Sequence, residues 1–555
     1  MRRQFARSSV TVKSVAALLT LVLSLGSVAP VAAQASRRNP QTPITWGTCY
    51  ELPDLPEDTG LECGKLSVPL DYGHPNGEKI DISVSRLPSK KPSNKRGILL
   101  SNPGGPGGPG LDMPLLLESI MPQDVIDSYD LIGFDPRFIG TSTPITCGLS
   151  AVKADQAFIM LTQENSFDKT ATFSKQVAQD CAAKSGDKLA HATTANTARD
   201  MDMIRKALGE PKLSYLGYSY GTYLGAVYAS LFKQQSDRMV LDSNVDPTGV
   251  WRQQFRDWGK AGEIRFPDFA HYLVANNDVF NLGADEKEIN NKFYQLTAGL
   301  DKNPYVFEDG TVFNGALFRR VTFGTLYSDL TFAYGAMVWA DVDNYISQPT
   351  PERGAQLKLH LAHLEGSTTS EEATDVPIDN AAAGGLAIAC GDTTWLRNPS
   401  VYKRDLQSDI AKYPMFGELG SNITPCAFWQ QHNNRPVELS STGKRNILLV
   451  QNRRDPATPY FSGQHMRKAL DKRARMVSVD QGGHAVSFIQ DNTCANDIVS
   501  NYLLRGDMPK VDTDCADETQ PEQAVSASTL RAKATNDAVD TKKKAQQEFV
   551  RRLTP

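Results

Sequence analysis

The sequence has no Cys-x-x-Cys pair, although it contains eight cysteines. Zinc ribbons and thioredoxin-type redox centres need closely spaced cysteines, so both are excluded, and no metal or other cofactor is expected. An excess of basic residues is also missing, because the chain of 555 residues has a net charge of -4. A mildly acidic protein gives no support for binding to nucleic acid, and no such partner is expected.

The chain also lacks a long apolar run near its N-terminus. The run that begins at Val15 is shorter than the roughly 20 residues that span a bilayer, so no stable membrane anchor is expected. A basic stretch precedes it, and small residues after it offer cleavage after Ala33 or Ala35. Residues 1–35 are therefore predicted to be a cleaved signal peptide of a secreted or cell-envelope protein. The Arg2-Arg3 pair leaves the twin-arginine export route open.

The eight cysteines predict disulfides, because their number is even and they follow an export signal. Many pairings are possible for eight cysteines. Pairing between nearest neighbours is expected, since each bridge would then close a short loop within one region. The expected bridges are Cys49–Cys63, Cys147–Cys181, Cys390–Cys426 and Cys494–Cys515.

Short apolar segments alternate with helical patterns in the first half of the chain. This alternation predicts a doubly wound, mostly parallel sheet of the α/β class. Helical spacing and many aromatics then replace the strands, and strands resume at 446–451 and 475–479. A large helical cap inserted before the last strands is therefore predicted. The expected parts are a signal peptide at 1–35, a first core part at 36–249, the cap at 250–440, a C-terminal core part at 441–516 and a polar tail, a frayed helix or mobile segment, at 517–555.

A nucleophile is predicted at Ser219. Residues 217–221 read Gly-Tyr-Ser-Tyr-Gly, a match to G-x-S-x-G that is weak taken alone. A predicted strand precedes it and a predicted helix follows, which is the context in which an α/β-hydrolase presents its serine above the sheet. Two glycines allow the strained turn and its close packing.

The serine needs a base and an acid. This fold places both later in the chain, first the acid and then the histidine that acts as the base. His484 follows the last predicted strand and is the expected base, whereas His465 lies in a helix-like stretch. Asp455 follows the strand before it and is the expected acid; Asp480 is the rival. A turn-forming role for Asp455 in its Asp-Pro pair is the alternative.

Backbone donors for an oxyanion are expected at two places. One is the N–H of Tyr220, the residue after the nucleophile. The other lies in the glycine-rich loop that starts at Asn102, where Gly105 is preferred and Gly104 is close behind. A phosphate-binding loop is disfavoured, because no Lys-Ser/Thr follows the glycines and prolines remove donors.

Together these motifs resemble the secreted tripeptidyl aminopeptidases of actinobacteria, relatives of the prolyl aminopeptidases. The resemblance implies an α/β-hydrolase core, a helical cap and a C-terminal segment that completes the triad. One departure stands out: Phe138 replaces a glycine of the family pattern Asp-x-Arg-Gly-x-Gly-x-Ser, which is expected to alter the rim of the pocket. The resemblance covers roughly residues 44–515 and rests on Glu62–Tyr72, Asn102–Gly107, Asp135–Arg137, Gly217–Thr222, Leu241–Asp242, Asp455–Pro459 and Gly483–His484.

Three functions follow as hypotheses. The first is a serine exopeptidase that releases short peptides, tripeptides by the resemblance, from free N-termini. Cap carboxylates would bind the substrate ammonium, with Asp257, Glu263 and Asp268 as candidates. The second is an esterase or amidase acting on small secreted compounds, which an aromatic cap suits equally well. A non-catalytic binding protein is disfavoured, because all three triad positions are filled.

Overall fold

The protein is represented by a computed structural model of the whole chain. It describes residues 44–50, 52, 59–159, 166–308, 310–365, 375–430, 434–518 and 541–553, and the predicted signal peptide lies outside them. All of these residues belong to one compact unit. Among them, no helix combines the length and the apolar character needed to cross a bilayer.

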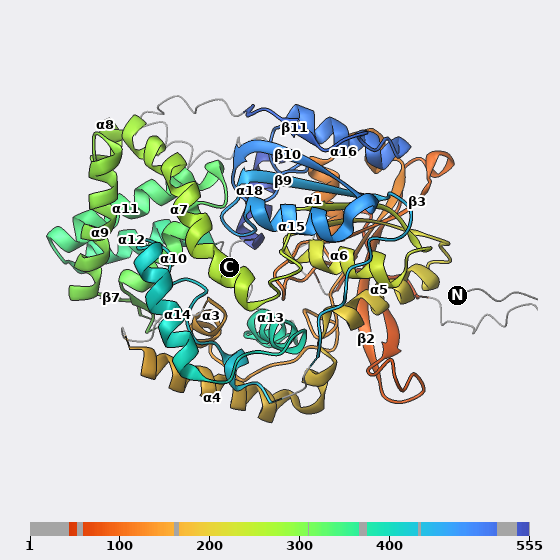
Figure 1. Cartoon of the computed structure of the whole chain (residues 1–555), viewed down its shortest axis with the longest axis horizontal. Coiled ribbons are helices and arrows are strands. Elements are labelled where there is room, and N and C mark those ends of the chain that lie inside the picture. The colour runs from red at the N-terminus through yellow and green to blue at the C-terminus, as the bar shows by residue number, and fades with distance from the viewer. Residues whose placement is uncertain are drawn as a thin grey trace, which may run out of the picture. The chain divides into compact units, whose positions relative to one another are not determined.

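One sheet of nine strands forms the core of the described chain (Figure 1). Its order is β1-β2-β4-β3-β5-β6-β9-β10-β11, antiparallel from β1 to β4 and parallel from there on. The predicted α/β-hydrolase core with a mostly parallel sheet is confirmed. The strands are β1 (Glu62–Pro69), β2 (Lys79–Leu87), β3 (Gly97–Asn102), β4 (Tyr129–Phe134), β5 (Leu213–Tyr218), β6 (Ser236–Asp242), β9 (Ile447–Arg454), β10 (Ala474–Gly482) and β11 (Thr513–Cys515).

The central strands are short apolar runs because both of their faces are covered. Every residue of β4 and of β5 is buried. Short 3-10 turns η1 (Pro92–Asn94) and η6 (Asp471–Arg473) precede β3 and β10. The helices that pack around this sheet are α1 (Met113–Ile120), α2 (Gln123–Ile126), α5 (Thr194–Ala207), α6 (Tyr220–Leu231), α15 (Tyr460–Leu470), α16 (Thr493–Arg505) and α18 (Thr541–Leu553).

The cap follows β6 and lies to one side of the sheet (Figure 1). Its aromatic residues form its own core, in which the ring centroids of Phe266 and Trp339 are 6.1 Å apart. The elements of this insertion are α7 (Arg252–Ala275), α8 (Asn277–Phe280), α9 (Glu286–Lys302), β7 (Tyr305–Val306), β8 (Val312–Phe313), α10 (Gly315–Thr325), η4 (Asp329–Thr331), α11 (Phe332–Ser347), α12 (Pro351–Glu365), α13 (Asn380–Gly391), α14 (Pro399–Lys412) and η5 (Pro425–Phe428).

Two helices that precede Ser219 in the sequence pack against this insertion. They are α3 (Ala151–Ile159) and α4 (Phe167–Ser185), which contact α13 and η5 respectively; η3 (Gly186–His191) follows α4. Ser174 of α4 donates to the carbonyl of Ile423 at 3.1 Å. The cover of the sheet therefore draws on the region between β4 and β5 as well as on the insertion.

Four disulfides lie in the described chain, and no cysteine there is free. They pair nearest neighbours, as the spacing predicts. Bridges of this kind persist in oxidising compartments, which supports an extracytoplasmic location. The bridges join Cys49 to Cys63, Cys147 to Cys181, Cys390 to Cys426 and Cys494 to Cys515.

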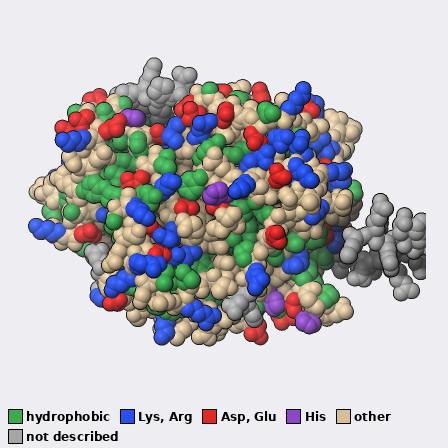
Figure 2. Space-filling view, in the orientation of Figure 1, with side chains coloured by type: hydrophobic (Ala, Val, Ile, Leu, Met, Phe, Trp, Pro, Cys, Tyr) green, Lys and Arg blue, Asp and Glu red, His purple; other side chains and the backbone are tan. Residues whose placement is uncertain are grey.

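Figure 2 shows acidic and basic side chains interspersed on the face in view.

Candidate active site

Ser219 lies in the sharp turn between β5 and α6. Its backbone has φ +56° and ψ -123°, a region that L-residues rarely adopt. The flanking glycines have no room for a side chain: a Cβ on Gly217 would lie 2.6 Å from the carbonyl oxygen of Gly221, and one on Gly221 would lie 2.9 Å from Oδ1 of Asn102. Ser219 is half-buried, whereas the residues on either side of it, Tyr218 and Tyr220, are buried.

Asp455 and His484 meet at the ends of neighbouring parallel strands, β9 and β10. The Nδ1 atom of His484 lies 3.0 and 2.9 Å from the two carboxylate oxygens of Asp455. Both side chains are almost fully buried, with 1% of His484 and 2% of Asp455 exposed. Asp455 also accepts N–H bonds from Ala457 and Thr458, each at 2.8 Å. These bonds fix the carboxylate, which in turn orients the imidazole.

The other ring nitrogen of His484, Nε2, is buried and has no hydrogen-bond partner among the described residues. Because Nδ1 is held by Asp455, Nε2 is the atom left to exchange a proton. Its surroundings are apolar on one side, where the ring of Tyr327 lies edge-on with centroids 5.2 Å apart. The carbonyl of Tyr327 accepts the backbone N–H of His484 at 2.7 Å. Tyr327, which follows α10 of the cap, therefore contacts both the ring and the backbone of the histidine.

Asp242 links the turn of Ser219 to the loop of His484. Its carbonyl accepts the Ser219 N–H at 3.0 Å. Its carboxylate accepts the N–H groups of Val486 at 3.1 Å and of Ser487. Ser243 completes the link, because its hydroxyl accepts the Ala485 N–H at 2.9 Å. Burial raises the pKa of Asp242 to about 6, and the hydrogen bonds from Ser487 and Val486 oppose that rise.

The glycine loop after β3 lies against Ser219. A Cβ on Gly104 would be 2.9 Å from Cβ of Ser219 and 3.5 Å from the amide nitrogen of Tyr220. The N–H of Gly104 itself donates to Oδ1 of Asn102 at 3.1 Å. Gly105 is exposed, and its N–H has no acceptor within the described chain. Tyr220 begins α6, so its N–H has no acceptor within the helix either.

The two rival residues lie elsewhere and have other partners. His465 is on α15, half exposed, with Nδ1 at 2.6 Å from Asp246. Asp480 is on β10, exposed, and pairs with Arg454 at 3.2 Å. Neither contacts the ring of His484, which leaves Asp455 as the carboxylate in its hydrogen-bonding range among the described residues.

The three cap acids that were candidates for binding an ammonium are each engaged by the protein. Asp257 accepts from Gln253 at 2.8 Å, and Glu263 accepts the Met415 N–H at 2.8 Å. Asp268 pairs with Arg265 and with Arg454. An ammonium group would compete with these partners.

Phe138, the departure from the family pattern, is fully buried rather than placed at a rim. It keeps the left-handed backbone that a glycine adopts easily, with φ +71°. Asn380 of α13 donates to its carbonyl at 2.9 Å, which fastens this loop to the cap. The aromatic side chain therefore adds buried apolar area under the cap.

Sequence patterns gave no role to Asp242, beyond its place in the Leu-Asp segment of the resemblance, and none to Tyr327. Asp242 ends β6, a buried strand that pairs with β5, the strand that precedes Ser219. A charged residue at the end of a buried strand is the sequence signal from which a role for Asp242 could have been predicted. Nothing near Tyr327 in the sequence marks it, because its contact with His484 spans the cap and the core.

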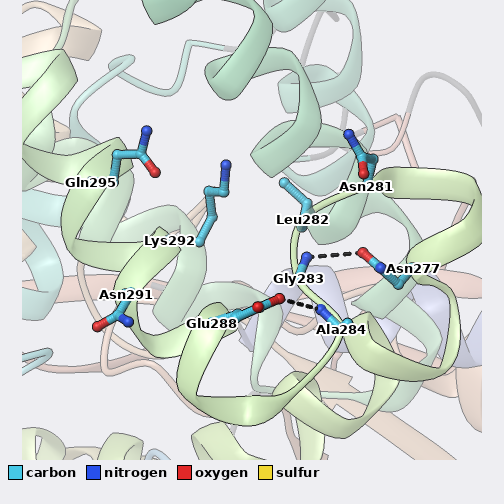
Figure 3. A pocket seen from close by; sticks show the side chains of 9 residues that line it. All are labelled: Asn277, Asn281, Leu282, Gly283, Ala284, Glu288, Asn291, Lys292 and Gln295. Atoms are coloured by element: carbon cyan, nitrogen blue, oxygen red, sulfur yellow. Dashed lines mark hydrogen bonds between the residues drawn. The ribbon is translucent and has the colours of Figure 1, made fainter.

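A hollow on the cap contains none of these residues. It lies between α8 and α9 (Figure 3). Glu288 accepts the Ala284 N–H at 2.7 Å, and Lys292 pairs with Asp343 at 3.1 Å, so its charged groups are already satisfied. Within the described residues, no cluster of His, Cys, Asp and Glu could hold a metal ion.

Comparison with known proteins gives several relatives that match almost end to end. The tripeptidyl aminopeptidase of Streptomyces coelicolor is 33% identical over 88% of this chain and 89% of its own length. Serine protease Hip1 of Mycobacterium tuberculosis is 31% identical over 90% of this chain and 96% of its own. Carboxylesterase B of the same organism is 28% identical over 90% and 98%.

A family model described as TAP-like protein matches residues 413–515. The matched segment contains Asp455 and His484. Together with the extent of identity to the Streptomyces enzyme, this match identifies the chain as a serine hydrolase. The chain belongs to the tripeptidyl aminopeptidase family of α/β-hydrolases.

Proposed function

We propose that this protein is an exported serine exopeptidase that releases short peptides, tripeptides in the first instance, from free N-termini. One observation carries the proposal: the buried pair of Asp455 and His484 is tied through Asp242 to the turn of Ser219. The names of two relatives, a tripeptidyl aminopeptidase and a serine protease, support peptides as the substrate class.

Each residue has a separate role in the proposed mechanism. Ser219 Oγ attacks the scissile carbonyl while His484 Nε2 takes its proton and then returns it to the leaving amine. Asp455 keeps the imidazole oriented and stabilises its cationic form. The N–H groups of Gly105 and Tyr220 donate to the oxyanion. Water then attacks the acyl-enzyme, with His484 again accepting a proton, and releases the peptide from Ser219.

The export part of the proposal rests on residues 1–35 and on the four disulfides. A cleaved signal peptide would remove the basic N-terminus and leave a mature chain that starts near Gln34 or Ser36. N-terminal sequencing of protein from the culture medium tests this. An intact Met1 on the exported protein would contradict it.

The nucleophile is tested by covalent labelling. A fluorophosphonate should phosphonylate purified enzyme on Ser219, with fluoride as the leaving group, and peptide mass spectrometry should locate the adduct in the peptide that contains it. Ser219→Ala should remove both the label and the hydrolysis. An adduct on a different serine would refute the assignment.

The substrate class is tested by changing the N-terminus alone. A free ammonium is the group that distinguishes a chain's end from its interior, and acetylation removes the charge that a carboxylate of the site would attract. N-acetylation of a good tripeptidyl substrate should therefore lower kcat/KM by about 30-fold or more. Equal turnover of both forms would favour an esterase or amidase, the class suggested by the name of the carboxylesterase relative.

A further inference from the structure

Helix α18 (Thr541–Leu553) buries one face on the core although its sequence is mostly polar. Phe549 and Val550 are 0% and 1% exposed, and Gln546 is 2% exposed. Lys544 and Glu548 lie on the outer face and are exposed. An isolated helix of this length is marginal in water, so its contacts with the core must stabilise it.

The first contact reaches the turn of the nucleophile. The ring of Phe549 meets the ring of Tyr218 edge-on, with centroids 4.7 Å apart. Tyr218 directly precedes Ser219, and its hydroxyl donates to the carbonyl of Ser487 at 2.8 Å. Phe549 therefore packs on a side chain that joins the turn of Ser219 to the loop of His484.

The second contact reaches the loop of His484 itself. Gln546 donates through Nε2 to the carbonyl of Phe488 at 3.2 Å, and this bond is buried. Lys542 pairs with Asp491 at 2.9 Å, a little further along the same loop. Phe488 has φ +67°, a conformation that surrounding contacts must hold in place.

The third contact reaches the segment after the glycine loop. Arg552 forms an ion pair with Asp112, the residue that precedes α1. Helix α1 starts three residues after the glycine loop ends at Gly110, and it packs beside α18. Arg552 also pairs with Glu548 at 2.8 Å, which orients the guanidinium.

We propose that α18 is a positioning element of the catalytic centre. A single helix contacts the turn of Ser219, the loop of His484 and the helix that follows the proposed oxyanion loop. Small displacements between these three segments would misalign attack, proton transfer and oxyanion binding, so the rate of acylation should depend on α18. The inference rests on the roles proposed for Ser219 and His484.

Phe549→Ala in the full chain is the first test, with Lys544→Ala on the exposed face of the same helix as the matched control. Phe549→Ala should lower kcat and the rate of fluorophosphonate labelling by roughly 10- to 100-fold while KM changes little, because the substitution acts on the alignment of the reacting groups. Phe549→Leu, which keeps most of the packing, should restore most of the rate, and Lys544→Ala should match the wild type.

Gln546→Leu is the second test, for the case in which Phe549→Ala fails to fold. Leucine has a side chain of similar size but cannot donate to the carbonyl of Phe488. A fall in kcat with an unchanged melting temperature would support the proposal. Unchanged kcat in the folded variants, or a change confined to KM, would overturn it. Failure of the wild-type enzyme to label at all would instead refute the proposed function.

Discussion

Two buried aspartates act on different parts of His484. Asp455 contacts the ring, and its carboxylate is held by the N–H groups of Ala457 and Thr458. Asp242 contacts the backbone after the ring, through Val486 and Ser487. A histidine can be aligned only if both its ring rotation and its backbone are fixed, so the two carboxylates have complementary effects.

Asp242→Asn tests the backbone part of this division. Asparagine has the same size, but its NH₂ group would face an N–H donor that the carboxylate now accepts, leaving a buried donor unsatisfied. We expect a loss of stability of about 1–3 kcal/mol and a fall in kcat of about tenfold or more. Steady-state kinetics and thermal melting measure the two effects.

The matched control is Asp237→Asn on the same strand, β6. Asp237 pairs with Arg96 near the surface, at the opposite end of β6 from Asp242. This change should leave kcat unaltered and cost little stability, because partly exposed ion pairs contribute little. Equal kcat in the wild type and in Asp242→Asn would show that Asp242 has no positioning role.

At the scale of elements, the sequence was informative where a pattern is local. Buried strands such as β4 and β5 are short apolar runs with Gly, Asp or Pro after them, so their positions and their sheet could be predicted. The turn at Ser219, with its flanking glycines, could be predicted for the same reason.

Elements whose role depends on distant partners could not be predicted. Helix α18 falls in the range expected to be a polar tail, because only a few apolar residues, Phe549 and Val550 among them, form its buried face. Helices α3 and α4 precede Ser219 in the sequence, and only the fold brings them against α13 and η5. Tyr327 contacts His484 across the interface between cap and core.

The Cys494–Cys515 bridge links the start of α16 to β11, and α16 in turn holds the segment after His484. Asn496 in its first turn accepts the Phe488 N–H at 2.8 Å and donates to the Gln490 carbonyl at 2.9 Å. Replacing both cysteines by serine should cost about 3 kcal/mol of stability, because the bridge no longer restricts the unfolded chain. It should also lower kcat, as the loop of His484 loses a support.

The double serine variant of Cys49 and Cys63 is the comparison for this bridge. That pair closes a loop of similar length, with a sequence separation of 14 against 21, at the other edge of the sheet. We expect a similar fall in melting temperature with kcat retained. Equal loss of kcat in both double variants would mean that the effect of Cys494–Cys515 is general destabilisation.

At the scale of the whole molecule, three buried carboxylates stand at junctions between segments. Asp135, Asp242 and Asp392 each have a pKa raised to about 6 by burial, and each accepts bonds from N–H and O–H donors. Asp392 joins the cap to the core: it follows α13 and accepts bonds from Thr194, the first residue of α5, and from Nε1 of Trp251, which precedes α7. The attachment of the cap should therefore depend on pH.

The sign of this dependence follows from the two states of Asp392. Its pKa is 3.8 as the reference value for the unfolded chain and about 6 when folded. Between these values the folded protein binds more protons, so the stabilisation that is fully present below about pH 4 is lost as the pH rises through about 6. A shift of this size corresponds to about 3 kcal/mol.

Asp392→Asn should remove this part of the pH dependence. We expect the melting temperature of the wild type to fall more between pH 4.5 and pH 7 than that of the variant. The comparison uses this change with pH, so a constant difference in melting temperature between the two proteins does not affect it. Asp497→Asn, a change at an exposed position on α16, should follow the wild type, because it leaves the contacts of Asp392 unchanged. Parallel curves for wild type and Asp392→Asn would show that this carboxylate does not titrate with folding, and the pH dependence would then have to come from other groups.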